Sequence, residues 1–316
     1  MSDSDFYPQK PELIESEQKT NWAATVFSIV LFILVFLFLF SNEINFILSL
    51  VLVLIIHELG HFSMMKLFGY KNVKMFFIPL MGAFVHGKKE EYSQKESLLV
   101  VSAGPFPGLI IGFGLMLVSQ HWNSPAAFQF GALFFILNII NLVPLDPLDG
   151  GLLFKLLVSK NQERFLMIFS FISSLLIIGS GFFLNSLLIM LFGFFMGFRV
   201  RALQKNVQLH KELQEENIPY TTTYKALSNK DFWRIKQILI ENTPTLKKYV
   251  EMADQEEVDS LLASQVNSVL ITPVKQDANL FQKLAITLLW LLALASPFIL
   301  YFLIDLNWVQ YAVSSW

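Results

Sequence analysis

The sequence contains no cysteine and few charged residues, and each shortage narrows the possible functions. Without cysteine there is no disulfide bond, no thiol nucleophile and no thiolate metal ligand, so any metal ion must be held by His, Asp or Glu. Charged residues make up 15% of the 316 residues, whereas a soluble domain carries roughly 25%. The net charge of −2 gives no argument for nucleic acid, and we expect no nucleic-acid partner.

In place of charges the chain has long apolar runs. Hydrophobic residues make up 54% of the chain, and they cluster into stretches near the length of about 20 residues that a helix needs to cross a bilayer. We therefore predict an all-α polytopic membrane protein that has the lipid bilayer as a partner. About seven transmembrane helices are expected, at residues 22–40, 44–68, 97–119, 127–145, 164–182, 183–199 and 282–304.

Two of these predicted spans share one uncharged stretch. No charge lies between Arg164 and Arg199, and this stretch is too long for one crossing and short for two. Gly179, Gly181 and Asn185 offer a tight turn near its middle, which favours two short helices over one strongly tilted helix. The first span, at 22–40, follows an acidic start and is longer than a signal-peptide core, so we interpret it as a retained helix.

Basic residues alternate between the predicted loops and indicate an orientation. The connections after spans one, three and five contain no Lys or Arg, whereas those after spans two, four and six contain several. The positive-inside rule then predicts a cytoplasmic N-terminus and an outside C-terminus in a multi-pass integral membrane protein. The compact architecture favours a bacterial inner membrane. The basic residues are Lys66, Lys71, Lys74, Lys88, Lys89, Lys95, Lys155, Lys160, Arg164, Arg199, Arg201 and Lys205.

One sizeable polar block interrupts the apolar pattern. Residues 201–281 contain nearly balanced acids and bases, and Ser228 with Asp231 resembles a capping box before an amphipathic stretch. We interpret this block as a small helical cytoplasmic region, with a solvated linker as the alternative. The predicted organisation is a polar cytoplasmic tail, a transmembrane core, this cytoplasmic region, and a last transmembrane helix with a short tail. Their bounds are 1–21, 22–200, 201–281 and 282–316.

The second predicted span contains LVLIIHELGHFSMM, in which His57, Glu58 and His61 lie among apolar residues. On a helix the two histidines lie one turn apart on the same face, a spacing that lets both imidazoles bind one zinc ion while the glutamate acts as general base. A charge at mid-bilayer costs on the order of 2.5–3.5 kcal/mol, so the presence of such residues in this span favours a functional role for them. The alternatives are mutually satisfied core polar groups, or a proton or ion path.

A hydrolytic zinc site usually takes a third protein ligand. His86, His121 and His210 lie outside the predicted spans, and we expect ordinary surface histidines there. The segment NLVPLDPLDGG, residues 141–151, brings Asp146 and Asp149 to the cytoplasmic side at a depth that suits His57 and His61. Its prolines and glycines allow an irregular backbone beside a ligand, although a helix terminus with surface acids remains the alternative.

HELGH within one membrane helix, followed about ninety residues later by PLDGG, resembles the site-2 protease family of intramembrane zinc metalloproteases. The resemblance covers residues 43–200 and implies a six-helix core with one Zn²⁺ per chain. It makes His57 and His61 metal ligands, Glu58 the catalytic residue and Asp149, rather than Asp146, the third ligand. Asn141 and Pro144 match residues that the family places beside the substrate helix.

Two further segments resemble the family. SAGPFPG at 102–108 is similar to a Ser-Ala-Gly-Pro segment of the third core helix, with Gly108 where the family often has asparagine. KNVKMFFIPLMGAFVHG at 71–87 corresponds to a short re-entrant β-hairpin near the site, whose edge would pair with an extended substrate. The candidate substrate-binding residues there are Gly82, Ala83 and Phe84, and the alternative is an amphipathic loop at the membrane surface.

The resemblance implies an intramembrane zinc metalloprotease that cuts within the transmembrane segment of a single-span substrate protein, as in regulated intramembrane proteolysis. Three rival functions remain at this stage. The first is a membrane metalloprotease of another HExxH family with a glutamate as third ligand. The second is a proton or ion transporter that uses intramembrane histidines, and the third is a scaffold with a spent active site. The oligomeric state is not indicated by the sequence.

Overall fold

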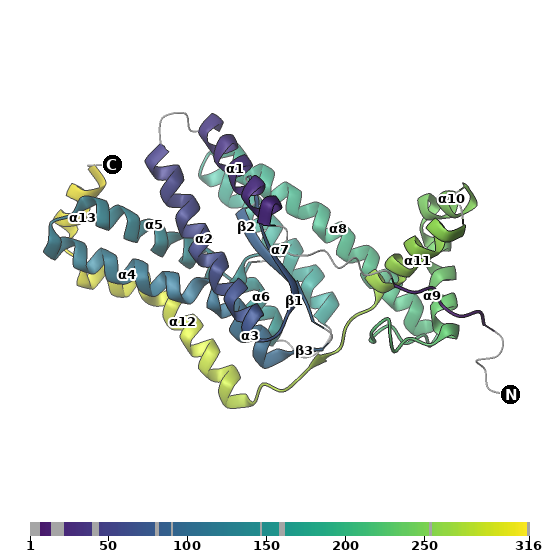
Figure 1. The fold of residues 1–316 in the computed structure, drawn as a ribbon. Helices are drawn as coiled ribbons and strands as arrows, with labels where there is room; N and C mark the ends of the chain where they lie inside the picture. Colours follow the sequence, from purple (N-terminus) through teal and green to yellow (C-terminus); the bar gives the residue numbers. More distant parts are fainter. Residues whose placement is uncertain are drawn as a thin grey trace. The chain divides into compact units, whose positions relative to one another are not determined.

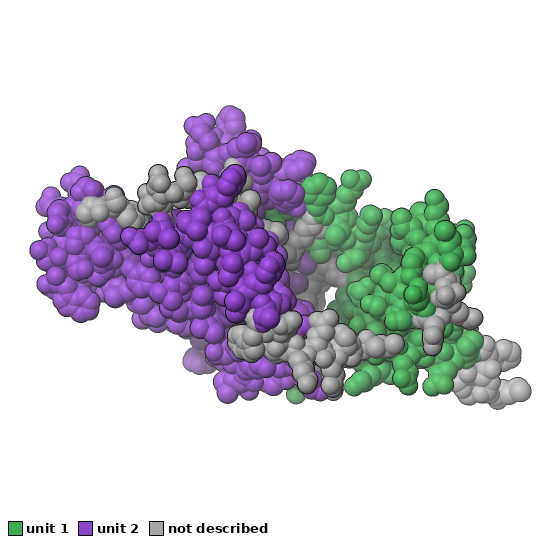
Figure 2. Space-filling view, turned by 45° about the horizontal axis from the view of Figure 1, so that its top comes forward, with its two compact units in different colours: residues 1–17, 90–92, 196–275 green, residues 18–89, 93–195, 276–316 purple. Residues whose placement is uncertain are grey.

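The computed structural model describes residues 7–13, 22–39, 44–79, 82–89, 91–145, 147–157, 162–252 and 255–314. Figure 1 shows the elements, which are mostly helices. The chain divides into two compact units, coloured separately in Figure 2. Unit 2 consists of residues 18–89, 93–195 and 276–316, and unit 1 consists of residues 1–17, 90–92 and 196–275.

Unit 2 contains the long apolar helices and the motifs. Five helical segments in the described residues are long and apolar enough to cross a membrane: 44–67, 94–122, 125–142, 164–183 and 280–303. These segments confirm a multi-pass membrane protein. The helices are α1 (Trp22–Leu39), α2 (Ile44–Leu67), α3 (Gln94–Ala103), α4 (Pro105–Trp122), α5 (Pro125–Leu142), α6 (Asp149–Leu157), α7 (Gln162–Phe183), α8 (Leu187–Glu215), α12 (Leu280–Leu303) and α13 (Leu306–Ser314).

The two other predicted spans are helical but shorter in their apolar part. In α1 the described apolar helix is 23–38, below the length of a clear span. In α8 the apolar residues stop at Arg199, after about three turns, and the helix continues as a polar helix to Glu215. The turn predicted between the fifth and sixth spans is present, because Asn185 has the left-handed φ of 49° between α7 and α8. A count of seven spans stays a prediction.

The predicted hairpin is present. Strand β1 (Lys71–Ile78) pairs antiparallel with β2 (Gly82–Lys88), with Met75 opposite Val85 and Phe77 opposite Ala83. Helix α1 lies along the hairpin (Figure 1) and occupies the outer edge of β1: the Thr25 hydroxyl donates to the carbonyl of Met75 at 2.8 Å, and the Phe77 amide donates to Ser28 Oγ at 3.1 Å. Two backbone groups on the outer edge of β1 are therefore already satisfied by side chains of α1. The short strands β3 (Tyr92–Ser93) and β4 (Val274–Lys275) form the other small sheet.

Helices α4 and α5 pack at very short range because glycines lie where they meet. A Cβ on Gly112 would lie 2.5 Å from the backbone nitrogen of Phe135, and one on Gly131 would lie 2.8 Å from Leu115 Cβ. Small residues at such contacts let helix backbones approach inside a bilayer, where the hydrophobic effect does not drive helices together. The approach holds α5, which contributes to the site described below, against α4.

The C-terminal end of unit 2 differs from the expected short tail, because residues 306–314 form helix α13 against α5. The side chain of Gln129 in α5 donates to the carbonyl of Ala312, and the indole of Trp308 donates to Ser119 Oγ. In α12 the indole of Trp290 donates to the carbonyl of Leu142 at 2.7 Å, at the end of α5. The last two helices therefore brace α4 and α5.

Unit 1 has its own helical core. Phe232, Ile235 and Leu262 are fully buried between α9 (Asn229–Asn242), α10 (Pro244–Met252), α11 (Gln255–Val269) and the second half of α8. The capping interaction predicted at α9 is present, since Ser228 Oγ accepts a hydrogen bond from the Asp231 amide at 3.1 Å. The expectation of a helical polar block is confirmed.

Residues 7–13, expected from the sequence to belong to a polar N-terminal tail, are part of unit 1 and pack on its helices. The Lys10 ammonium donates to the carbonyls of Tyr224 and Leu227, and the Trp233 indole donates to the carbonyl of Pro8 at 2.8 Å. The hydroxyl of Tyr224 donates to the carbonyl of Pro11. Burial and the negative charge of Asp259 raise the pKa of Tyr224 to about 12, so this hydroxyl keeps its proton at neutral pH.

The prediction of a surface histidine is wrong for His210. The side chain is buried, its Nε2–H donates to the carbonyl of Val269 at 2.8 Å, and its ring stacks on Tyr220. His210 is buried because it lies on the face of α8 that covers the core of unit 1. The polar sequence around it gives no sign of this burial. His86 and His121, by contrast, are exposed as expected.

Replacing Gly112 with Ala is expected to lower the stability of the chain by about 1–3 kcal/mol, because the added methyl group meets backbone atoms of α5 that cannot move aside. Thermal unfolding of the detergent-solubilised protein measures the effect. The control is Gly114→Ala in the same helix, where nothing lies within 4 Å of the new Cβ. Equal melting temperatures for the two variants would show that α4 and α5 do not depend on this close contact.

Candidate metal centre

Helix α2 supplies two histidines and a glutamate to the interior of unit 2. His57, Glu58 and His61 are only 5%, 4% and 8% exposed, although the surrounding sequence is apolar enough to cross a membrane. Because the two histidines are four residues apart in a continuous helix, their rings lie on one face with centroids 4.9 Å apart. The helix alone thus pre-forms half of a metal site.

Asp149 reaches the two histidines from the bend that follows α5. It is the first residue of α6, and its side chain is 12% exposed. The bend is tight: a Cβ on Gly150 would lie 2.0 Å from the carbonyl oxygen of Leu142, so only glycine lets the start of α6 fold back onto the end of α5. The requirement for glycine here is steric, and it places the aspartate beside α2.

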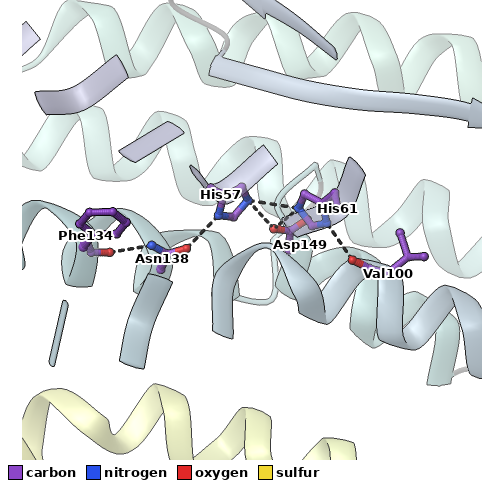
Figure 3. Close-up of polar contacts among 6 residues, drawn as sticks. All are labelled: His57, His61, Val100, Phe134, Asn138 and Asp149. Carbon is purple, nitrogen blue, oxygen red and sulfur yellow. Dashed lines mark hydrogen bonds and ion pairs between the residues drawn. The ribbon is translucent and has the colours of Figure 1, made fainter. Parts of the chain in front are cut away.

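Three ligand atoms converge at this point (Figure 3). Asp149 Oδ2 lies 3.0 Å from His57 Nε2 and 3.3 Å from His61 Nε2, and the two Nε2 atoms are 3.2 Å apart. A tetrahedral zinc ion lies about 2.0–2.1 Å from its ligand atoms, which separates those atoms by roughly 3.3 Å. Among the described residues these three side chains form the one group of His, Asp and Glu with the geometry to hold a metal ion.

The hydrogen bonds around the histidines explain why these atoms need a cation. His57 Nδ1 lies 2.8 Å from Asn138 Oδ1, and His61 Nδ1 lies 2.8 Å from the carbonyl oxygen of Val100. A carbonyl oxygen only accepts, so in each neutral ring Nδ1 carries the hydrogen and Nε2 presents a lone pair. Asp149 Oδ2 is buried and accepts no hydrogen bond from the described residues. Three lone pairs then face one another, and the donor set fits Zn²⁺.

Asn138 was missed from the sequence. It is fully buried in α5, its Oδ1 contacts His57, and its amide nitrogen donates to the carbonyl of Phe134 at 2.7 Å. An amide in the middle of an otherwise apolar span is the signal that could have identified Asn138. The same criterion, a polar residue within an apolar span, singles out His57, Glu58 and His61 in α2. Asn141, three residues later, is the asparagine that matches the family pattern.

The segment SAGPFPG ends α3 and begins α4, and its glycines lie against the site. A Cβ on Gly104 would lie 2.2 Å from His61 Nε2, and one on Gly108 would lie 2.3 Å from Asn138 Nδ2. On α2 itself, a Cβ on Gly60 would lie 2.0 Å from the carbonyl oxygen of Ala103. The absence of side chains at these positions is therefore what brings α3 and α4 up to the histidine face of α2.

The remaining predicted site residues belong to the end of α5, the bend after it and strand β2. Asn141 is in the last turn of α5 and Pro144 is in the bend after it, both partly buried. Gly82, Ala83 and Phe84 begin β2, where Phe84 is 44% exposed and packs on Phe76. Within the described residues, no hydrogen bond or ion pair joins any of the five to the ligand cluster. Asp146 lies outside the described residues.

Comparison with known proteins agrees with this geometry. Residues 45–134 match the model of peptidase family M50, a stretch that contains both histidines and Glu58. The resemblance to the site-2 protease family is therefore confirmed for the region that carries the HELGH motif.

Three relatives illustrate the likeness. Stage IV sporulation protein FB of Bacillus subtilis is 31% identical over 134 residues, which is 41% of this chain and 46% of that protein. A zinc metalloprotease of Methanocaldococcus jannaschii is 32% identical over 111 residues, 34% of this chain and 32% of the relative. A putative zinc metalloprotease of Synechocystis is 32% identical over 122 residues, 36% of this chain and 32% of the relative. The alignments thus cover less than half the length of each relative.

Replacing Asp149 with Asn is expected to weaken zinc binding by more than about 100-fold, beyond the loss typical of changes outside the ligand shell, because the substitution removes the negative ligand. Zinc per chain after dialysis against a chelator measures the loss. Asp146→Asn is the matched control, an aspartate three residues away in the same segment. If Asp149→Asn retained as much zinc as the wild-type chain, the third ligand would have to be another residue.

Proposed function

We propose that this protein is an intramembrane zinc metalloprotease that hydrolyses peptide bonds within transmembrane segments of membrane-protein substrates. The observation that carries the proposal is the convergence of His57, His61 and Asp149 inside apolar helices, with Glu58 buried beside His57. The names of two relatives, which describe zinc metalloproteases, support the same chemistry. The HELGH helix lies within residues 45–134, the stretch that the family model matches.

The chemistry divides between the metal and the chain. His57, His61 and Asp149 would hold one Zn²⁺, which, when bound, makes a water molecule nucleophilic at neutral pH and polarises a carbonyl group. Glu58 follows His57 in α2 and would act as general base, accepting the proton of the attacking water and then donating it to the leaving amine. His61 and His57 keep their Nε2 lone pairs available because each Nδ1–H is used by a fixed acceptor.

A transmembrane substrate hides its scissile carbonyls in helical hydrogen bonds and must be extended before it can be cut. The hairpin offers a surface for an extended strand. In an antiparallel pair, successive residues direct their backbone groups alternately toward and away from the partner strand. Because Met75 and Phe77 use their backbone groups toward α1, their partners Val85 and Ala83 direct theirs to the outer edge of β2, where no other strand pairs among the described residues. We assign substrate pairing to this edge.

The substrate would be a single-span membrane protein, processed in the manner of regulated intramembrane proteolysis. Gly82 and Phe84 belong to the proposed edge strand, and Asn141 with Pro144 would lie beside the substrate helix, near the bend that carries Asp149. An N-terminus in the cytoplasm, supported by the basic loops of the sequence, and a place in a bacterial inner membrane, favoured by the compact architecture, complete the proposal.

The decisive variant is Glu58→Gln, which keeps the size of the side chain and removes the base. Cleavage of a single-span substrate peptide in proteoliposomes is expected to fall by about 10²–10⁴-fold, the usual contribution of general acid–base catalysis. Zinc per chain should stay unchanged. Glu251→Gln, at an exposed position of unit 1, serves as the control.

Two results would count against the protease. Cleavage by Glu58→Gln at the wild-type rate would remove the glutamate from the mechanism. A wild-type chain without stoichiometric zinc, but with a proton or ion flux in the same proteoliposomes, would support a transporter that uses its intramembrane histidines.

The role of the β2 edge is tested with Val85→Pro. Proline removes the outward N–H and is tolerated at an exposed edge, so the hairpin should persist. The loss of one hydrogen bond, about 0.5–1.5 kcal/mol, predicts a decrease in kcat/KM of up to about tenfold with zinc content unchanged. Val85→Ala separates the loss of the side chain from the loss of the N–H. Equal kcat/KM for the two variants would place substrate pairing elsewhere.

A further inference from the structure

The two histidines donate to different kinds of hydrogen-bond acceptor. His61 Nδ1 donates to the backbone carbonyl of Val100 in α3, a partner that every amino acid provides. His57 Nδ1 donates to the side chain of Asn138 in α5, a partner that a single substitution removes. Figure 3 shows the two acceptors on opposite sides of the ligand cluster. The orientation of His57 is therefore the part of the site that depends on a residue outside the motifs.

The orientation of the Asn138 amide follows from its second contact. Its other polar atom lies 2.7 Å from the carbonyl oxygen of Phe134, one turn earlier in α5. Because that oxygen only accepts, the atom facing it must be the amide NH₂, and the amide oxygen must face His57. The oxygen then fixes the hydrogen of His57 on Nδ1 and leaves Nε2 as a lone pair toward Asp149.

The space for this amide is provided by a glycine of another helix. A Cβ on Gly108 in α4 would lie 2.3 Å from Nδ2, 2.8 Å from Cγ and 2.9 Å from Oδ1 of Asn138. All three atoms belong to the end of a side chain rather than to the backbone. A methyl group at position 108 would therefore displace the amide from His57 and leave the helices in place.

We propose that Asn138 is a positioning residue for the metal ligand His57, and that Gly108 is coupled to it as the position that keeps the space for its amide. The inference rests on the proposed function, because it assigns these residues to the zinc site. Full burial of Asn138 and the use of both ends of its amide are what distinguish it from an ordinary polar residue in a membrane helix.

The test measures metal binding in the full-length, detergent-solubilised chain. The variants are Asn138→Ala, Gly108→Ala and the double variant, with Gly114→Ala in the same helix as the matched control. The dissociation constant for Zn²⁺ is obtained by competition with a chelator, and the visible spectrum of bound Co²⁺ reports the geometry of the ligands. Circular dichroism at the same temperature checks that each variant is folded.

Asn138→Ala is expected to weaken zinc binding by about 10–100-fold, as is usual when the hydrogen-bond partner of a metal-bound histidine is lost. Gly108→Ala should cause a similar loss and the same change in the Co²⁺ spectrum. The double variant should be no worse than Asn138→Ala alone, since the methyl group then fills the space that the amide has left. Gly114→Ala should bind zinc as the wild-type chain does.

Two outcomes would each overturn one part of the proposal, the positioning role of Asn138 or its coupling to Gly108. Variants that melt at a lower temperature but keep the wild-type zinc affinity and Co²⁺ spectrum would assign Asn138 to helix packing only. Losses that multiply in the double variant would show that Gly108 acts independently of the amide. A wild-type chain that binds no zinc would instead refute the proposed function, whereas variants equal to a zinc-binding wild type refute the positioning role alone.

Discussion

Three lone pairs that face one another within about 3.3 Å inside apolar helices repel unless a cation lies between them. Each Nδ1–H of His57 and His61 is already donated to an oxygen, so the lone pairs of the neutral rings and of Asp149 require a cation, either a metal ion or a proton on Nε2. The polar interior of unit 2 therefore has a structural reason to bind metal, apart from any catalytic reason. A divalent ion held by the three side chains would also link α2 to α6.

Keeping the three groups together requires four helices to approach α2 and one another closely. Glycine is the means at each contact: Gly60 meets α3, Gly104 meets His61, Gly108 meets Asn138 and Gly150 meets the end of α5. In a bilayer such close contacts replace the hydrophobic effect as the source of helix association. The residues that lack side chains are thus as much a part of the site as the ligands, since any of them enlarged would move a helix or a ligand.

The sequence reveals the elements of this site that have a local signature. HELGH has a local signature because a single helix sets the spacing of its residues. The bend around Asp149 has a local signature in its prolines and glycines. Asn138 has no spacing signature, since its partner lies in a helix 81 residues away. Burial of His210 and the packing of α13 on α5 are also tertiary facts, which composition hides. The number of spans is hard to predict for a different reason: α8 continues without a break from apolar to polar residues, so the end of the sixth span has no local signal.

Helix α1 makes the two edges of the hairpin different. A free two-stranded sheet has two edges to which an extended chain could add, and open edges invite pairing with the wrong partner. The hydroxyl groups of Thr25 and Ser28 satisfy the carbonyl of Met75 and the amide of Phe77 on the outer edge of β1. The proposed substrate strand would therefore pair beside β2. The resemblance covers residues 43–200 and assigns no role to α1. Helix α1 would thereby determine on which side of the hairpin a substrate lies.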